Sequence, residues 1–223
     1  MTAHSGADDT ADNSREYLDY ILTTGVDASE IDVRYARDTL VLSHDPVADG
    51  QDVVTLAEAF ALLAAAPEMR MNCDLKTPGL EAAVYEAAVD AQVADRILFS
   101  GSVSVARMRE AGLLGRVEVY LNIEETVPVP EDFSLRGMSV DAQTVHAACQ
   151  VCADAGIRVM NVPAAIVDEA FLRILHGYGL NASVWTVDDM DEAARFIALH
   201  VESITTKKAA DLTALLSRMT DSD

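Results

Sequence analysis

The feature that most constrains this chain is a regular alternation of short β-type runs with helix-type segments. Such alternation is typical of parallel strands joined by helices. Eight β-type runs can be counted, at residues 2–5, 28–34, 70–76, 96–101, 117–123, 157–163, 182–187 and 202–206. Eight units in 223 residues predict an α/β fold, a compact (β/α)8 TIM barrel that residues 1–223 form as a single domain.

Three details refine this prediction. The run LVLS at residues 40–43 does not fit the count and is expected to form an extra strand or hairpin arm. An open doubly wound sheet is the alternative fold, but no G-x-G-x-x-G follows the first strand. Thr55 and Glu58 have the spacing of a capping box, so a helix is expected to begin after Thr55.

The charge of the chain excludes some partners. Acidic residues outnumber basic ones by 37 to 16, giving a net charge of −21 and a pI near 4.3. Such a surface repels phosphate backbones and anionic lipids, so neither nucleic acid nor stable membrane association is expected. No signal peptide is recognisable, and Cys73, Cys149 and Cys152 are too few for a disulfide framework. A cytoplasmic protein is expected, and its oligomeric state stays open.

Carboxylates interrupt two of the predicted strands, where an apolar side chain would cost less. In SEIDVR, Glu30 and Asp32 are two residues apart and project from the same face of the strand. Their α-carbons are then roughly 6.5 Å apart, so both side chains can reach one cation. In NCDLK, Asp74 and Lys76 share a face in the same way. In a parallel barrel these positions lie near the carboxyl ends of adjacent strands, where such folds place their sites.

Three converging carboxylates indicate a metal site. Without a cation, like-charge repulsion would raise the pKa of at least one of them. A divalent ion relieves this repulsion, and ligation by oxygen alone favours Mg²⁺ or Ca²⁺ over zinc. Glu30, Asp32 and Asp74 are therefore the predicted metal ligands. Lys76 either joins this site or forms a structural ion pair with Asp74.

Two histidines stand at the ends of predicted strands. His4 ends the first run, and His44 ends LVLSH. Imidazole titrates near neutral pH, so two histidines beside a metal and a lysine can serve as general base and general acid. Either histidine alone would more often be structural, but together with the carboxylates they indicate an active site. His4, His44 and Lys76 are the predicted catalytic residues.

In their order along the chain, these residues resemble the motifs of the glycerophosphodiester phosphodiesterase family, part of the barrel superfamily of the phosphoinositide-type phospholipases C. The family's H-R-G, E-N-T, E-x-D-V, H-D, E-x-K and V-W-T-V have counterparts between residues 3 and 207. They are His4-Ser5-Gly6, Asp12-Asn13-Ser14, Glu30-Ile31-Asp32-Val33, His44-Asp45, Asp74-Leu75-Lys76 and Val184-Trp185-Thr186-Val187. Only nine residues, Pro46 to Val54, occupy the interval in which the family commonly carries a small inserted domain. That domain is expected to be absent.

The resemblance implies a phosphoric diester hydrolase of lipid and glycerol metabolism. It would use a divalent metal to cleave a small-molecule phosphodiester, such as a glycerophosphoalcohol, to glycerol phosphate and an alcohol. By the same resemblance the three carboxylates hold the metal, and His4 and His44 exchange protons with the nucleophile and the leaving group. Lys76 would neutralise charge on the phosphoryl group. Trp185 would contact the alcohol or glycerol part of the substrate, or pack within the barrel.

Two departures from the family pattern leave alternatives open. Ser5 stands at the position of the family's substrate-binding arginine and is therefore the predicted substrate contact there, but it lacks the arginine's fixed positive charge and bidentate phosphate contact. This motivates a second hypothesis, a barrel that binds a phosphorylated ligand without turning it over. Asp74 replaces the usual glutamate, as in the sphingomyelinase-D-type phospholipases, whose reaction yields a cyclic phosphate. An aldolase that uses Lys76 as a Schiff base is a weaker alternative.

Overall fold

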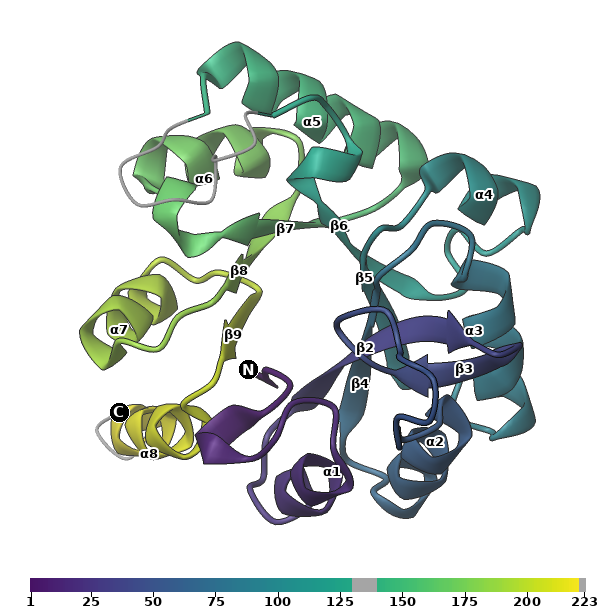
Figure 1. Cartoon of the computed structure of the whole chain (residues 1–223). Coiled ribbons are helices and arrows are strands. Elements are labelled where there is room, and N and C mark those ends of the chain that lie inside the picture. The colour runs from purple at the N-terminus through teal and green to yellow at the C-terminus, as the bar shows by residue number, and fades with distance from the viewer. Residues whose placement is uncertain (130–139, 221–223) are drawn as a thin grey trace.

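Eight parallel strands form a closed ring in the computed structural model, which describes residues 1–129 and 140–220 (Figure 1). The ring closes because β1 pairs with both β2 and β9. In their order around the ring the strands are β1 (Thr2–Ala3), β2 (Ala28–Ala36), β4 (Arg70–Leu75), β5 (Ile97–Gly101), β6 (Glu118–Asn122), β7 (Val159–Pro163), β8 (Asn181–Trp185) and β9 (Ser203–Thr206). The predicted TIM barrel is confirmed.

Helices surround the ring on its outside (Figure 1). The α-helices are α1 (Arg15–Ile21), α2 (Leu56–Ala65), α3 (Glu81–Asp90), α4 (Val105–Glu110), α5 (Ala142–Ala155), α6 (Glu169–Gly177), α7 (Met190–Ala198) and α8 (Ala209–Thr220). Short 3-10 helices follow three strands, namely η1 (Ala7–Asp9), η2 (Ile123–Glu125) and η3 (Ala164–Ile166). Thr55 and Glu58 form the predicted capping box at the start of α2, which satisfies amide groups that have no partner inside the helix. Within the described residues, no helix combines the length and the apolar character that a bilayer crossing requires.

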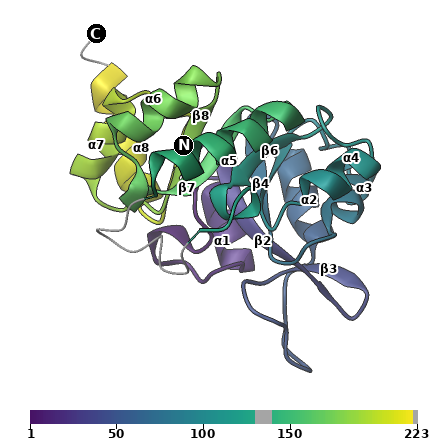
Figure 2. The same cartoon turned by 90° about the horizontal axis from the view of Figure 1, so that it is seen from above.

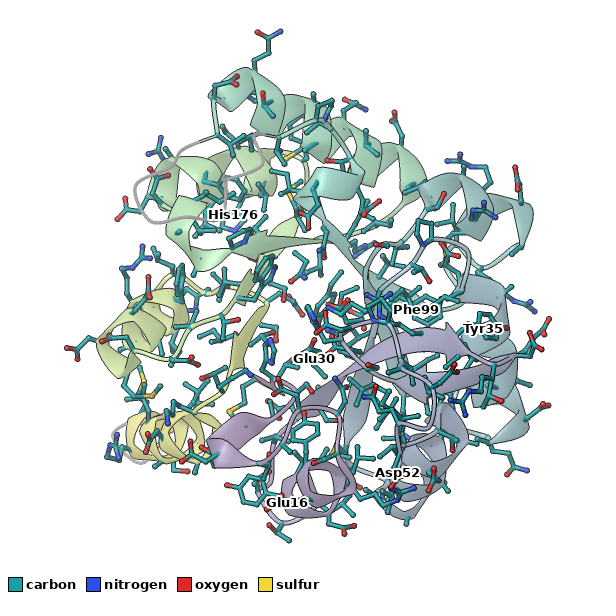
Figure 3. The ribbon with its side chains drawn as sticks, viewed as in Figure 1. Glu16, Glu30, Tyr35, Asp52, Phe99 and His176 are labelled. Atoms are coloured by element: carbon teal, nitrogen blue, oxygen red, sulfur yellow. The ribbon has the colours of Figure 1, made fainter. Side chains whose placement is uncertain are left out.

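The extra run forms a hairpin arm, as predicted. Strand β3 (Thr39–Leu42) pairs antiparallel with the end of β2, and Figure 2 shows this arm projecting from the rest of the molecule. Tyr35, on the arm, is 51% exposed and lies far from the barrel centre in Figure 3. Residues 43–54 contain neither a helix nor a strand, so the inserted domain is absent as expected.

Seven of the eight barrel strands are shorter than predicted, and only β2 is longer. Strand β1 ends at Ala3, so His4 lies just beyond it, and β8 ends at Trp185. After β1 the chain turns at Gly6, which has a left-handed φ of 74°. A Cβ atom at Gly6 would lie 1.9 Å from Asp12 Oδ1, so this turn requires glycine.

The main core lies between the strands and the helices. Outward side chains such as Ile31, Cys73 and Phe99 are fully buried in one apolar cluster. Burying each large apolar side chain contributes about 1.5–3 kcal/mol to stability. Cys149 and Cys152, on α5, belong to the same cluster as free thiols. Burial raises the pKa of Cys149 to about 11 and that of Cys152 to about 12, so both remain protonated at neutral pH.

The barrel interior is a second, smaller buried region. Near the amino ends of three strands, Leu98, Tyr120 and Val159 form an apolar cluster of their own. Toward the carboxyl ends the inward side chains become polar, and Figure 3 shows Glu30 in the middle of the barrel. This change along the strands places the candidate site.

Candidate active site

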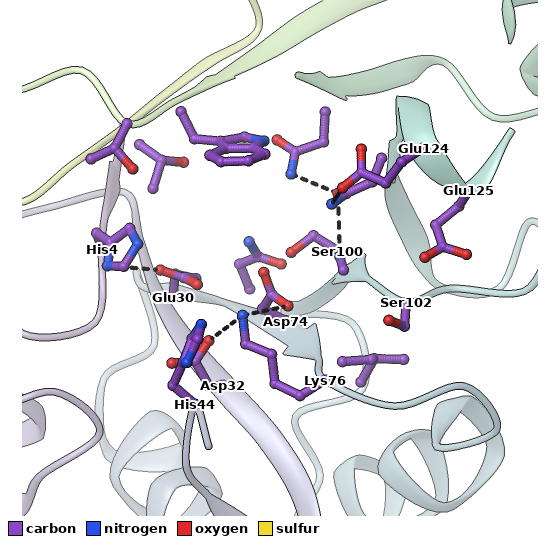
Figure 4. Close-up of a pocket in the computed structure, with 18 residues that line it drawn as sticks. His4, Glu30, Asp32, His44, Asp74, Lys76, Ser100, Ser102, Glu124 and Glu125 are labelled. Carbon is purple, nitrogen blue, oxygen red and sulfur yellow. Dashed lines mark hydrogen bonds and ion pairs between the residues drawn. The ribbon is translucent and has the colours of Figure 1, made fainter. Parts of the chain in front are cut away.

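A cavity of about 370 Å³ opens at the carboxyl ends of the barrel strands. Its walls contain seven of the eight residues predicted to form the site, namely His4, Glu30, Asp32, His44, Asp74, Lys76 and Trp185. These residues come from five strands or the loops that follow them. Figure 4 shows the first six converging on one region of the cavity.

The strand register brings the acidic residues together. Glu30 and Asp32 alternate with outward-facing Ile31 on β2, and Asp32 is the register partner of Asp74 on β4. Oxygen atoms of all three carboxylates lie within 4.8 Å of one another. Gly101 makes room for this arrangement, because a Cβ atom there would lie 2.2 Å from Asp74 Oδ1.

Lys76 is the cation beside this cluster. Its Nζ lies 2.8 Å from Asp32 Oδ1 and 3.3 Å from Asp74 Oδ1, and its side chain is 19% exposed. Burial lowers the pKa of Lys76, but Asp74 and Asp32 outweigh burial and raise it above its ordinary value. The ammonium group is therefore charged at neutral pH, with its charge directed into the cavity.

One lysine does not balance three carboxylates. Burial raises the pKa of Glu30 to about 7, and Asp74 and Asp32 add to this rise while His4 and Lys76 oppose it. Burial also raises the pKa of Asp74, with repulsion from Asp32. The pKa of at least one member of the cluster is thus raised, as expected, but burial is a larger cause than the predicted repulsion between like charges. An all-oxygen donor set with uncompensated negative charge fits a divalent cation such as Mg²⁺ or Ca²⁺.

Asn13 holds the Asp32 carboxylate in position. Its Nδ2 donates to Asp32 Oδ2 at 2.6 Å, and its Oδ1 accepts the Asp32 backbone N–H at 2.9 Å. The Tyr17 hydroxyl donates to the backbone carbonyls of Ala3 and Glu30 at 2.8 and 3.0 Å, which joins β1 to β2 beneath the site. Neither residue was predicted as part of the site, although Asn13 appears in a quoted motif.

Ser5 is the predicted site residue that the structure places elsewhere. It is fully buried and does not line the cavity. Its Oγ accepts the Asn13 backbone N–H at 2.8 Å, and its own N–H donates to Glu30 Oε2 at 3.1 Å. The short hydroxyl satisfies the turn before α1 and does not reach toward a ligand. Ser5 was expected to contact the substrate. In the structure it instead supports Asn13 and Glu30 through these hydrogen bonds.

The two histidines differ in exposure but share a tautomer. His4 Nδ1 lies 2.9 Å from the Ser5 carbonyl oxygen and 3.5 Å from Glu30 Oε2. His44 Nδ1 lies 3.1 Å from Asp45 Oδ1, and the His44 side chain is 64% exposed. Both partners of Nδ1 are acceptors when Asp45 is ionised, so each neutral ring carries its proton on Nδ1. The Nε2 lone pair of each ring can then accept a proton.

The opposite wall of the cavity carries polar residues that the sequence did not predict. Asn161 Nδ2 donates to Asn122 Oδ1 at 2.8 Å, and Asn122 Nδ2 donates to Glu124 Oε1 at 2.8 Å. Figure 4 places Glu124 and Glu125 across the cavity from Glu30. Asn122 ends β6 and Asn161 lies in the middle of β7, each two residues after an inward apolar residue, so period-two alternation could have predicted both. Glu124 lies in a 3-10 turn, where no period marks its direction.

Four buried polar atoms in the cavity walls have no hydrogen-bond partner within the described part of the chain. They are Asn72 Oδ1, Ser100 Oγ, Glu124 Oε2 and Trp185 Nε1. Buried polar groups are normally paired, and each unpaired one costs about 1–3 kcal/mol. A hydrophilic ligand in the cavity would supply the missing partners.

Comparison with known proteins shows which solved structures the chain resembles. The sequence matches no protein-family model, and no curated protein is significantly similar to it. Solved structures do resemble it. A glycerophosphodiester phosphodiesterase from Parabacteroides distasonis is 17% identical, with 98% of each chain covered and a TM-score of 0.73. A glycerophosphodiester phosphodiesterase from Agrobacterium tumefaciens is 16% identical, with 96% of this chain and 98% of that chain covered and a TM-score of 0.69.

A third structure has a bound product. It is an Oleispira antarctica phosphodiesterase in complex with sn-glycerol-3-phosphate, 16% identical, with 97% of this chain and 96% of that chain covered and a TM-score of 0.70. At such identities the likeness establishes the fold. The chain therefore has the TIM-barrel fold of the glycerophosphodiester phosphodiesterases over nearly its whole length.

Proposed function

We propose that this chain is a single-domain, metal-dependent phosphodiesterase of the glycerophosphodiester type, which cleaves a small-molecule phosphodiester to glycerol phosphate and an alcohol. The observation that carries the proposal is the convergence of Glu30, Asp32 and Asp74 oxygens within 4.8 Å, in one cavity with Lys76. The fold shared with phosphodiesterases that act on such substrates supports it.

The three carboxylates would hold a Mg²⁺ or Ca²⁺ ion, which would supply positive charge for the phosphoryl oxygens. Asn13 orients Asp32 for that role through its two hydrogen bonds. Lys76 Nζ stabilises the negative charge that develops on the phosphoryl group, because it is charged and partly shielded from water. The main contribution of the protein is thus electrostatic.

Two proton transfers complete the reaction. One histidine accepts the proton of the attacking water at Nε2 as the new P–O bond forms. The other, protonated histidine donates to the alcohol oxygen as its bond to phosphorus breaks. His4 and His44 suit these roles, since both line the cavity and both direct Nδ1 to an acceptor.

The experiment uses protein stripped of metal and then supplied with Mg²⁺ or Ca²⁺. Release of glycerol phosphate from a panel of glycerophosphodiesters is expected only with metal. Asp32→Asn should remove metal binding, measured by calorimetry, together with turnover. Asp95→Asn is the matched control, because Asp95 is exposed just before β5 at the amino end of the barrel. Turnover that persists in chelator would contradict the proposal.

A second candidate function follows from Ser5. Because a serine stands where the family has an arginine, Lys76 is the only lysine or arginine among the described residues that line the cavity. A binder without turnover would show a rise in melting temperature with a phosphodiester and metal, and no product. Phosphorus NMR of the products also separates hydrolysis from the sphingomyelinase-D-type outcome, since a cyclic phosphate has its own resonance.

A further inference from the structure

Glu124 is a pre-oriented carboxylate without a defined role in the proposed reaction. It lies on the wall opposite the metal-binding carboxylates, where Asn122 donates to its Oε1 at 2.8 Å and Asn161 in turn fixes Asn122. Asn122 and Asn161 are 8% and 7% exposed, so this relay is held inside the barrel. The side chain of Glu124 is therefore aimed by buried partners.

The other half of this carboxylate has no partner. Within residues 1–129 and 140–220, Glu124 Oε2 is buried and forms no hydrogen bond. Ser100, in the same cavity, is 1% exposed, and its Oγ also has no partner. Two unpaired buried acceptors on one wall indicate that a ligand completes this side of the cavity.

The net charge of the cavity indicates which charge that ligand carries. Among the described residues, five carboxylates line it, and Lys76 is the only lysine or arginine that does so. In the described part of the chain, neither Glu124 nor Glu125 forms an ion pair, whereas Lys76 pairs with Asp32 and Asp74. Burial and the negative charges of Glu124 and Glu81 raise the pKa of Glu125. A divalent ion at the three carboxylates would leave this wall negative.

The aromatic group of the cavity suits the same ligand. Trp185 lines the cavity at the end of β8, and the face of an indole ring attracts cations. Its buried Nε1 is a donor without a partner and could meet a phosphate or hydroxyl oxygen. The cavity thus offers a carboxylate, an indole ring and a hydroxyl group.

We infer that Glu124 is a specificity-determining residue, which selects phosphodiesters whose alcohol part carries a positive charge, such as an amino alcohol or a quaternary ammonium alcohol. Asn122 is its positioning residue. The inference rests on the proposed function, because it requires the phosphate to lie at the carboxylates of β2 and β4. The charged alcohol then extends to the opposite wall.

The test compares two diesters that differ only in this part, at low ionic strength: glycerophosphocholine, and glycerophosphoglycerol, whose alcohol part is uncharged. The ratio of their kcat/KM values should favour the choline diester. Glu124→Gln keeps the acceptor for Asn122 and removes the charge. It should lower the ratio about tenfold, a size between the effects of an exposed and a buried charge pair. Glu124→Lys should invert the preference.

The matched control is Glu110→Gln, which makes the same change of net charge at an exposed position outside the cavity. It should leave the ratio unchanged. A wild-type enzyme that prefers glycerophosphoglycerol, or a ratio that Glu124→Gln does not change, overturns the inference while the proposed function stands. If neither diester is hydrolysed, the proposed function fails, and calorimetric titration with both diesters decides the inference. In that case the inference requires that the wild type binds the choline diester more tightly than glycerophosphoglycerol. It also requires that Glu124→Gln loses this difference in affinity.

Discussion

The two ends of the barrel interior are made by the same strands and carry opposite kinds of side chain. On β5, β6 and β7, the inward residues near the amino ends are Leu98, Tyr120 and Val159. Two residues later on the same strands, the inward side chains are Ser100, Asn122 and Asn161. One period of a strand, roughly 6.6 Å, separates an apolar plug from a polar cavity.

This difference teaches where stability and function are separated in the molecule. At the amino end, the apolar side chains of Leu98, Tyr120 and Val159 pack against one another. At the carboxyl end, charged side chains are buried next to like charges, and Glu30 has a raised pKa of about 7 as a result. The carboxyl end therefore costs stability that the amino end and the outer core provide. Substitutions at the two ends should have separable effects.

The largest expected effect is the loss of turnover in His4→Ala. Removing a general acid or base commonly lowers the rate by 10²–10⁴-fold, so kcat should fall about 10³-fold. The melting temperature should change little, because the His4 side chain is partly exposed and makes one hydrogen bond. Steady-state kinetics and calorimetry check both statements. Wild-type activity in this variant would remove the histidine from the mechanism.

Leu98→Ala at the amino end should have the opposite profile. Deleting a buried leucine leaves a cavity in the plug, so the free energy of unfolding should fall by about 3 kcal/mol. Denaturant titration measures this loss. The kcat of the folded fraction should match that of the wild type, because Leu98 does not line the active-site cavity. A fall in kcat as large as that of His4→Ala would show that the two ends are coupled.

Metal-free protein should become less stable as the pH rises from about 4.5 to about 7. In this window an unfolded chain ionises Glu30, whose ordinary pKa is 4.5, while the folded state keeps the proton up to about pH 7. The folded state then binds more protons, so the loss reaches about 3 kcal/mol above pH 7. Other carboxylates also titrate, so the measured quantity is the difference between the wild type and Glu30→Gln at each pH.

That difference should grow with pH and level off above pH 7. Added Mg²⁺ or Ca²⁺ should stabilise the wild type more at pH 8 than at pH 5, because the ligand carboxylates must be ionised. Glu30→Gln should show a much smaller response to metal. Parallel pH curves for the two proteins would contradict the raised pKa of Glu30.

The sequence predicts the direction of a side chain only where the chain is a strand, because side chains there alternate between two faces. This alternation holds along β2 and β4, and there the sequence correctly brought Glu30, Asp32, Asp74 and Lys76 into one cavity. Turns have no such alternation, so the direction of a side chain in a turn cannot be predicted in this way. Position 5 corresponds to the family's arginine in the sequence, but the side chain there points to the Asn13 backbone, which only the folded turn reveals.

Glu124 was missed for the same reason. It follows β6 in a 3-10 turn, and its direction depends on Asn122 and Asn161, which are brought together by the pairing of β6 with β7. The sequence pattern predicts the strands, but it does not predict these hydrogen bonds between amide side chains of neighbouring strands. Residues that orient a ligand group from a neighbouring element therefore have to be found in the structure.

The smallest expected effect is on metal affinity, and it should differ between two asparagines at opposite ends of the barrel. Asn13 clamps Asp32 through two hydrogen bonds, whereas Asn181, at the start of β8, donates to the His200 carbonyl oxygen at 3.0 Å. Asn13→Ala should weaken metal binding about tenfold, since losing a group that orients a metal ligand typically costs 10–100-fold in affinity.

Asn181→Ala removes the same atoms from the amino end and should leave metal affinity unchanged. Calorimetric titration of both variants with Ca²⁺ makes the comparison directly, and their melting temperatures show whether either fold is disturbed. Equal metal affinities in the two variants would mean that Asn13 only supports the turn before α1. A selective loss in Asn13→Ala would instead show that orientation of Asp32 by a residue outside the strands is part of the site, because the carboxylate itself is unchanged in that variant.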